Sequence, residues 1–135
     1  MHKVLVIEDN KEIRENTAEI LELNGYYVFT AENGSIGYES AKSYQPDIIL
    51  CDIMMPETDG REFMRLVKAD IVINCIPIIF FSAGTSQELQ KELLDGKNAY
   101  LKKPFSETEL LIVIKNGLNK RTDHLNHGHT INTDF

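Results

Sequence analysis

Short apolar runs alternate with amphipathic segments along most of this chain, and this order constrains the fold more than any other feature. Runs rich in β-branched and aliphatic residues, bounded by Gly, Pro or Asn, predict strands at Lys3–Ile7, Tyr26–Thr30, Asp47–Cys51, Ile78–Ser82 and Ala99–Lys102. Helical segments are expected over 10–24, 35–44, 61–68 and 86–94, and again from residue 106. Strands that alternate with helices form a parallel sheet covered on both faces. The sequence therefore predicts an α/β fold with a doubly wound parallel sheet.

Helix start and stop signals support these ranges. Asn10 has the residue type and position of an N-cap, and Gly25 follows the same segment as a stop. Ser106 and Glu109 have the spacing of a capping box at the start of the last helix. We expect the helices to begin and end near these residues.

Length and charge indicate one acidic domain. Residues 1–121 of the 135-residue chain are expected to form it, and residues 122–135, which lose apolar periodicity, to form a polar tail that is flexible or a truncated linker. The histidines of this tail, His124, His127 and His129, are interpreted as tail residues rather than a metal site. A net charge of −7 argues against direct nucleic-acid binding. Without a membrane-spanning run or signal pattern, the chain is expected to be cytoplasmic.

The two cysteines do not have the spacing of a disulfide framework. Cys51 lies within a predicted strand and Cys75 precedes another. Both are interpreted as small buried apolar residues in a reducing compartment.

Carboxylates follow two of the predicted strands. Glu8 and Asp9 come directly after the first strand, and Asp52 follows the apolar run Ile48–Cys51. If these strands are parallel neighbours, the three side chains meet at one edge of the sheet, where open α/β folds bind ligands. Like charges this close disfavour each other's ionisation, and a hard divalent cation such as Mg²⁺ relieves the repulsion. This arrangement predicts a Mg²⁺ site suited to phosphate chemistry.

Two further polar residues are expected at the same edge. Ser82 ends the fourth predicted strand, and Lys103 follows the fifth. Together with Asp52 they supply a nucleophilic carboxylate, a hydroxyl donor and a cation. Phosphoryl transfer needs mainly positioning and charge stabilisation from a protein, and a carboxylate can attack phosphorus to form an aspartyl phosphate. The set therefore favours phosphoryl transfer to Asp52.

Four motifs in order resemble those of the receiver domain of two-component response regulators. They are Glu8-Asp9, the run from Asp52 through Met55-Pro56 to Gly60, Ser82-Ala83, and Lys103-Pro104-Phe105. The resemblance covers about Lys3 to Lys120. It implies a flavodoxin-like (βα)5 fold with strand order 2-1-3-4-5 and a site between the first and third strands.

The resemblance also implies a role for each matching residue. Asp52 would be the phosphoacceptor, and Ser82 and Lys103 would hold the phosphoryl oxygens. Tyr100 matches an aromatic that turns inward on phosphorylation. The Mg²⁺ ligands would be Asp9, Asp52, the backbone carbonyl of Met54 and, through water, Glu8. One departure from the family pattern is Lys97, which follows Gly96 where a small Ala is usual, so the loop before the fifth strand is expected to pack differently.

The implied partners are proteins. A sensor histidine kinase or a histidine phosphotransfer protein would supply the phosphoryl group, and a downstream protein or output domain would respond to the conformational switch. The resemblance also allows a homodimer formed on phosphorylation.

Two other functions fit the sequence less well. A Mg²⁺-dependent phosphatase or phosphotransferase with an aspartyl intermediate would need an acid/base carboxylate two residues beyond the nucleophile, where this chain has Met54. A phosphate-independent binding module would not need the complete residue set. The sequence favours a signalling switch over a metabolic enzyme.

Overall fold

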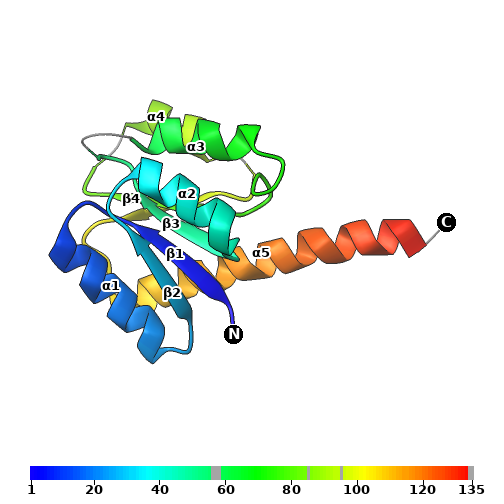
Figure 1. Cartoon of the computed structure of the whole chain (residues 1–135), viewed down its shortest axis with the longest axis horizontal. Helices are drawn as coiled ribbons and strands as arrows, with labels where there is room; N and C mark the ends of the chain where they lie inside the picture. The colour runs from blue at the N-terminus through cyan, green and yellow to red at the C-terminus, as the bar shows by residue number, and fades with distance from the viewer. Residues whose placement is uncertain (56–58, 85, 95, 134–135) are drawn as a thin grey trace.

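The computed structural model has a central sheet with helices on both faces (Figure 1). It describes the backbone of residues 1–55, 59–84, 86–94 and 96–133, and side chains as far as residue 120. The elements in chain order are β1 (Lys3–Ile7), α1 (Lys11–Leu23), β2 (Tyr27–Ala31), α2 (Gly34–Tyr44), β3 (Ile48–Asp52), α3 (Gly60–Ala69), β4 (Ile78–Ser82), α4 (Gln87–Leu93), β5 (Ala99–Lys102) and α5 (Glu107–Thr133).

The five strands are all parallel and lie in the order β2-β1-β3-β4-β5. The register pairs Ile7 with Cys51 across β1 and β3, and Ser82 with Lys102 across β4 and β5. The order reverses direction between β1 and β3, which is the switch point where open α/β sheets bind ligands. The predicted flavodoxin-like fold and its strand order are confirmed.

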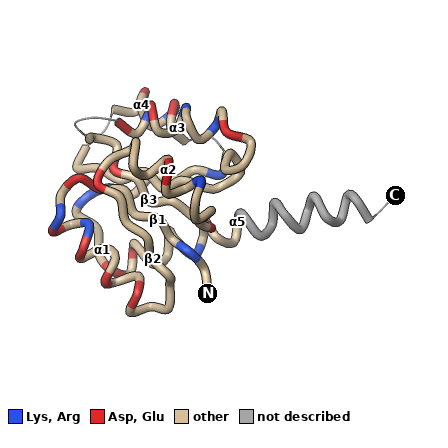
Figure 2. Tube along the Cα trace, viewed as in Figure 1, with Lys and Arg blue, Asp and Glu red and all other residues tan. Residues whose placement is uncertain are grey.

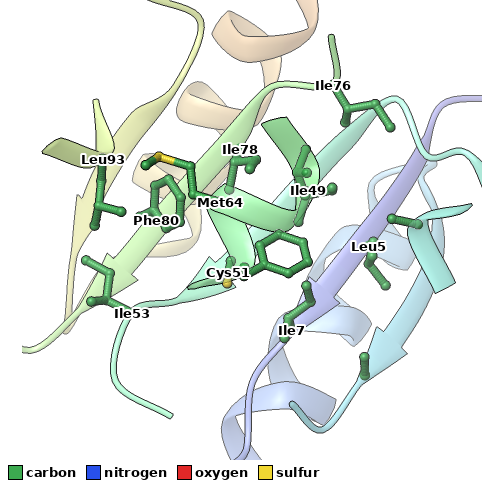
Figure 3. Packing of buried hydrophobic residues seen from close by; sticks show 14 of the residues in the cluster. Leu5, Ile7, Ile49, Cys51, Ile53, Met64, Ile76, Ile78, Phe80 and Leu93 are labelled. Carbon is green, nitrogen blue, oxygen red and sulfur yellow. The ribbon is translucent and has the colours of Figure 1, made fainter. Parts of the chain in front are cut away.

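Alternate side chains of each strand enter two separate cores. Leu5, Ile49 and Phe80 belong to the core under α2, α3 and α4, part of which is shown in Figure 3. Val6, Leu50 and Phe81 point to the opposite face and pack with residues of α1 and α5. Because both faces are covered, the central strands are continuously apolar, as parallel sheets require.

Side-chain caps fix the helix starts that position the site. The Asn10 carboxamide accepts a hydrogen bond from the backbone N–H of Ile13 at 3.0 Å, which confirms the predicted N-cap of α1. At α5, the Glu109 N–H donates to the Ser106 hydroxyl and the Ser106 N–H donates to the Glu109 carboxylate, both at 3.1 Å. This reciprocal pair is the predicted capping box.

The last helix is longer than the apolar pattern indicated. α5 continues to Thr133, so its backbone is helical across the stretch 122–133 that was predicted to be a polar tail (Figure 1). The side chains of His124, His127 and His129 lie outside the described part of the chain. The boundary at residue 121 stays a prediction.

The interpretation of Cys75 as a buried residue was wrong, whereas Cys51 is buried as expected. Between α3 and β4 the chain makes successive turns, in which Ile73 N–H donates to Asp70 O and Ile76 N–H donates to Ile73 O, both at 3.1 Å. These turns direct Ile73 and Ile76 into the core and leave Cys75 facing solvent.

In the part of the chain that the structure describes, no helix is long and apolar enough to cross a membrane.

Candidate phosphoacceptor and metal site

The polar residues predicted from the strand ends meet at one edge of the sheet. Asp52 is the last residue of β3 and Ser82 the last of β4, while Glu8 directly follows β1 and Lys103 directly follows β5. These strands are neighbours, and the parallel arrangement brings their carboxyl ends to the same side. Tertiary structure therefore assembles residues that are separated by up to 95 positions in the sequence.

Three carboxylates form a compact cluster at this edge. One carboxylate oxygen from each of Glu8, Asp9 and Asp52 lies within 4.8 Å of the others. Glu8 is fully buried and Asp52 is 4% exposed, whereas Asp9 faces solvent. The donors are hard oxygens of like charge with one solvent-facing side, a set that fits Mg²⁺ with its retained waters. Among the described residues, this is the cluster of His, Cys, Asp and Glu that could hold a metal ion.

Ionisation of the clustered carboxylates is disfavoured by burial and by their proximity to one another. Burial, and next the hydrogen bond with Asp52, raise the pKa of Glu8 above its ordinary value, although Lys103 opposes the shift. Loss of solvation and the neighbouring Glu8 carboxylate likewise raise the pKa of Asp9. A bound cation would lower both pKa values by stabilising the ionised forms.

Lys103 is the cation that the protein itself places in the cluster. Its Nζ lies 2.7 Å from Glu8 Oε1 and 3.5 Å from Asp52 Oδ2. The ammonium group also lies 4.9 Å from the centre of the Phe81 ring, a cation–π contact that holds the side chain over β4. Lys103 therefore bridges the buried carboxylate and the predicted phosphoacceptor, as its position before Pro104 suggested. Lys102, the preceding residue, is exposed.

Ser82 and Tyr100 contact each other beside the carboxylates. The two hydroxyl oxygens are 3.4 Å apart, and the Tyr100 hydroxyl also donates to the Ser82 carbonyl at 3.4 Å. Ser82 is buried, and the Tyr100 ring is half-buried against the core under α4. The structure thus links the predicted switch aromatic to the predicted hydroxyl donor; its movement on phosphorylation stays a prediction.

Backbone contacts constrain the described part of the loop after Asp52. The Met54 N–H donates to Asp52 Oδ1 at 3.3 Å, and the Gly60 N–H donates to the Ile53 carbonyl at 2.9 Å. A Cβ at Gly60 would lie 3.1 Å from Ile53 Cα, so a side chain there would press on this loop. The Met54 side chain is 67% exposed, and Met55 is buried in the core. Pro56, part of the motif, lies outside the described residues.

Two supporting residues were not singled out from the sequence. Arg14 donates to the backbone carbonyl of Glu8 at 2.8 Å and that of Asp9 at 3.4 Å, and so orients the acidic pair. Asn98 is buried, accepts from the Ile78 N–H at 2.9 Å and donates to the Leu93 carbonyl at 3.2 Å. Arg14 lies one turn after the predicted N-cap, and this spacing only weakly indicates that its side chain reaches the acidic pair. No pattern in the sequence indicates the hydrogen bonds of Asn98.

An apolar groove adjoins the site. It has a volume of about 450 Å³ and runs between α1 and the segment after β5, lined mainly by Ile13, Thr17, Ile20, Ala83, Lys103 and Phe105. Lys103 lines this groove and also contacts Glu8 and Asp52, so the groove borders the acidic cluster.

The raised pKa of Glu8 predicts a pH dependence of stability. A group whose pKa is higher in the folded than in the unfolded state favours folding below the unfolded value, and this contribution is lost as pH rises. With a chelator present, wild type is therefore expected to lose stability relative to Glu8→Gln as pH rises from 4.5 through the raised pKa. Urea unfolding of both proteins over a pH series measures the difference. Glu19→Gln, at an exposed position in the interior of α1, is the control, and a flat difference for Glu8→Gln would contradict the prediction.

A parallel sheet in this strand order, with an acidic cluster and a lysine at its switch point, defines a flavodoxin-like protein with a site suited to phosphoryl groups. The family model described as response regulator receiver domain matches residues 4–115. The chain therefore belongs to the response regulator receiver domain family of two-component signal transduction.

Curated relatives include both small and large proteins. Protein PilG of Pseudomonas aeruginosa is 37% identical over 114 residues, which cover 84% of each chain. The phosphate regulon transcriptional regulatory protein PhoB of Klebsiella pneumoniae is 34% identical over 84% of this chain and 50% of its own length. Hybrid signal transduction histidine kinase D of Dictyostelium discoideum is 38% identical over 84% of this chain, but this chain spans only 7% of that kinase.

Solved structures share the fold over most of the chain. The chemotaxis protein CheY4 of Vibrio cholerae has a TM-score of 0.79 and 32% identity, with 85% of this chain and 97% of that chain covered. A putative response regulator from Chloroflexus aurantiacus has a TM-score of 0.80 and 28% identity, with 87% and 98% covered. The similarity therefore extends to nearly the whole of both neighbours.

Proposed function

We propose that this chain is a phosphorylation-dependent signalling switch in which Asp52 accepts a phosphoryl group. The observation that carries the proposal is the position of Lys103 Nζ, 3.5 Å from Asp52 Oδ2 and 2.7 Å from Glu8 Oε1. An ammonium group at this place pairs with the Asp52 carboxylate before phosphorylation, and it can pair with the phosphoryl oxygens once the group is attached. Asp52 is nearly buried, so the interaction is little screened by water.

The chemistry proposed is a single displacement at phosphorus. An Asp52 carboxylate oxygen forms a bond to phosphorus while the bond from phosphorus to the nitrogen of a donor phosphohistidine, or to the oxygen of a small acyl phosphate, breaks. Lys103 donates hydrogen bonds to one phosphoryl oxygen, and the Ser82 hydroxyl donates to another. These groups act by positioning and charge stabilisation, which is what phosphoryl transfer requires.

Mg²⁺ is the proposed cofactor, and the donor set of the acidic cluster supports it. Asp9 and Asp52 would hold it directly, with the Met54 backbone carbonyl as a third protein ligand and Glu8 through water. When bound, Mg²⁺ neutralises charge on the phosphoryl oxygens. Arg14 keeps the Glu8 and Asp9 backbone in place, and the Met54 N–H orients Asp52.

The conformational response is proposed to pass through Ser82 and Tyr100. If the Ser82 hydroxyl turns to a phosphoryl oxygen, it leaves its 3.4 Å contact with the Tyr100 hydroxyl. Phosphorylation then favours the conformation of β4 and β5 in which the hydroxyls of Ser82 and Tyr100 both have hydrogen-bond partners. It thereby shifts an existing equilibrium between two conformations. Such a protein catalyses its own phosphorylation and dephosphorylation and turns over no separate metabolite.

The proposed partners are those of two-component signalling. A sensor histidine kinase or histidine phosphotransfer protein would donate the phosphoryl group, and the apolar groove beside Lys103 is a suitable surface for that protein. A downstream protein or output domain would read the switched conformation. Dimerisation on phosphorylation is a further proposal that follows from the family alone.

Beryllofluoride, which mimics a phosphoryl group on a carboxylate, tests the switch without a covalent reaction. Adding it with Mg²⁺ to the wild-type chain is expected to shift the amide NMR signals near Asp52, Ser82 and Lys103, and those of Tyr100 on β5. Asp52→Asn should show none of these shifts. Unchanged spectra for the wild type would contradict the proposal, and shifts confined to Asp52 would refute the relay through Tyr100.

A further inference from the structure

The strand β2 lies at one edge of the sheet and, among the described strands, pairs with β1 alone (Figure 1). The Tyr27 N–H donates to the residue before β1 at 2.9 Å, and the Ala31 carbonyl accepts from the residue after β1 at 3.0 Å. Backbone groups of successive residues in a strand point to opposite sides, and those on the outer side of an edge strand are open to another strand. The N–H and C=O groups of Val28 and Thr30 therefore point away from the sheet.

This edge lacks the features that usually protect an edge strand. Natural edge strands commonly carry a charged residue, a Pro or a bulge, each of which hinders pairing with a further strand. Residues 26–31 read Tyr-Tyr-Val-Phe-Thr-Ala, without charge or Pro (Figure 2), and the register of β2 with β1 is continuous. The opposite edge strand, β5, carries Lys102. β2 is therefore the edge that is open to an added strand.

A hollow of about 370 Å³ adjoins the β2 edge. It is lined by Glu22, in the last turn of α1, and by the consecutive residues Tyr26, Tyr27, Val28 and Phe29. Tyr26 and Val28 pack on the face of α1 and α5, whereas Phe29 packs on the face of α2, α3 and α4. The hollow thus contacts side chains from both faces of the sheet, as a chain segment beside the edge would.

Aromatic rings flank the edge on the side of α2. The ring centroids of Tyr27 and Phe29 are 5.1 Å apart, and Phe29 stacks on Tyr44 at 4.2 Å. Tyr27 is 55% exposed and Tyr44 is 49% exposed, so much of their surface is available for contact. In β-strand addition, backbone hydrogen bonds supply affinity and side-chain contacts of alternate residues supply specificity. The edge offers both kinds of contact.

The unpaired charges at this edge are acidic. Glu22 in the hollow and Glu32, directly after β2, are exposed, and within the described part of the chain neither has an ion pair. Lys3, which lies beside Tyr27 in the register, donates from its ammonium group to the Tyr44 carbonyl at 2.8 Å. The net charge of the chain is −7. A cationic side chain is therefore the complement of this edge.

We propose that the β2 edge binds an extended, basic segment of a partner protein, which adds to the sheet as a further strand. The backbone of the segment would pair with the outward groups of Val28 and Thr30. Its aliphatic side chains would contact the Tyr27 and Phe29 rings, and a Lys or Arg would pair with Glu22. The inference does not depend on phosphorylation of Asp52.

A basic segment fits this edge better than a second copy of the same chain. Two copies related by two-fold symmetry would pair β2 with β2 in antiparallel orientation. Pairing about Phe29 would place Tyr26 opposite Glu32 of the other copy and so bring that carboxylate towards Glu22. Like charges opposite each other destabilise strand pairing, and each copy also carries a net charge of −7. A basic segment avoids both repulsions.

The test is a titration of the full chain with a short peptide in which Val and Thr alternate between a Lys at each end, followed by amide NMR and hydrogen exchange. The amide signals of Val28 and Thr30 are expected to shift and their exchange with solvent to slow. The Tyr27 N–H already bonds to the β1 side, so its exchange should change little. The same peptide with Pro in place of each Val cannot pair as a strand and should cause no shift.

Substitutions at the edge test how the peptide binds. Thr30→Pro removes an outward N–H and leaves the bonds to β1 in place, so it is expected to weaken binding about fivefold. Thr30→Val keeps the N–H and, as the matched control, should bind like wild type. Glu22→Lys should weaken binding about threefold at low ionic strength. Circular dichroism checks folding, and Glu22→Lys decides if Thr30→Pro is unfolded.

Three outcomes would overturn the proposal. Protection of the Val28 and Thr30 N–H groups without peptide, together with a dimer in analytical ultracentrifugation, would place a second copy at the edge. Equal binding of the peptide that contains Pro would exclude strand addition. Shifts located away from β2, or equal weakening by Thr30→Val and Thr30→Pro, would exclude the outward backbone groups as the binding site.

Discussion

Replacing Lys103 with alanine is expected to destabilise the chain by about 3 kcal/mol in the absence of divalent cations. Glu8 is fully buried and its carboxylate is paired with Lys103 at 2.7 Å, so the substitution leaves a buried charge without its partner. The neighbouring Asp52 carboxylate adds repulsion once the shared ammonium group is gone. Urea unfolding in a chelator measures the loss of free energy of unfolding.

A double-mutant cycle separates this mechanism from a simple loss of packing. Lys103→Ala combined with Glu8→Gln is expected to recover most of the lost stability, because the uncompensated charge is then absent. Lys102→Ala, at the exposed neighbouring position, should change stability by less than about 0.5 kcal/mol. If Lys103→Ala were as stable as wild type, or if Glu8→Gln gave no recovery, the ion pair would not have the role assigned to it. The Lys103→Ala variant should also fail to switch with beryllofluoride.

Asp9→Asn is expected to change metal affinity and stability in opposite directions. Removing one carboxylate from the cluster should weaken Mg²⁺ binding by about tenfold or more, since even residues that only support metal ligands have effects of this size. The metal-free chain should become more stable, because the ionised Asp9 is disfavoured by lost solvation and by Glu8, as its raised pKa indicates.

Calorimetric titration with Mg²⁺ and urea unfolding in a chelator measure the two effects on the same protein. Glu19→Gln removes an exposed carboxylate from the interior of α1, away from both helix ends, and should leave both quantities unchanged. If Asp9→Asn bound Mg²⁺ with the affinity of wild type, Asp9 would not be a ligand. If Asp9→Asn were less stable than wild type in the chelator, the repulsion assigned to Asp9 and Glu8 would be contradicted.

Local patterns in the sequence were sufficient to predict the strands, the helices and the position of the site. The Asn10 cap, the Ser106 and Glu109 capping box, and the polar residues at strand ends each depend on neighbours within a few positions. Because parallel strands place their carboxyl ends together, strand-end residues converge once the strand order is correct. The acidic cluster and Lys103 were predictable for this reason.

Contacts between distant elements were not predictable in the same way. Asn98 satisfies the Ile78 N–H across the sheet, and the Tyr38 hydroxyl donates to Asp70 at 2.7 Å between α2 and the end of α3. Cys75 is exposed because of how one turn is oriented, a property that its apolar neighbours do not encode. The extension of α5 to Thr133 also has no apolar periodicity to indicate it. The hydrogen bonds of Asn98 and Tyr38 and the exposure of Cys75 depend on tertiary placement rather than on residue spacing.

Intact-mass analysis after incubation with acetyl phosphate tests the central claim most directly, because it detects the phosphoryl group itself. The account predicts one added phosphoryl group on the wild-type chain with Mg²⁺, and none when a chelator replaces Mg²⁺ or when Asp52→Asn is used. An adduct that persists in Asp52→Asn, or that forms equally well without Mg²⁺, would contradict the assignment of Asp52 as the phosphoacceptor of a Mg²⁺-dependent switch.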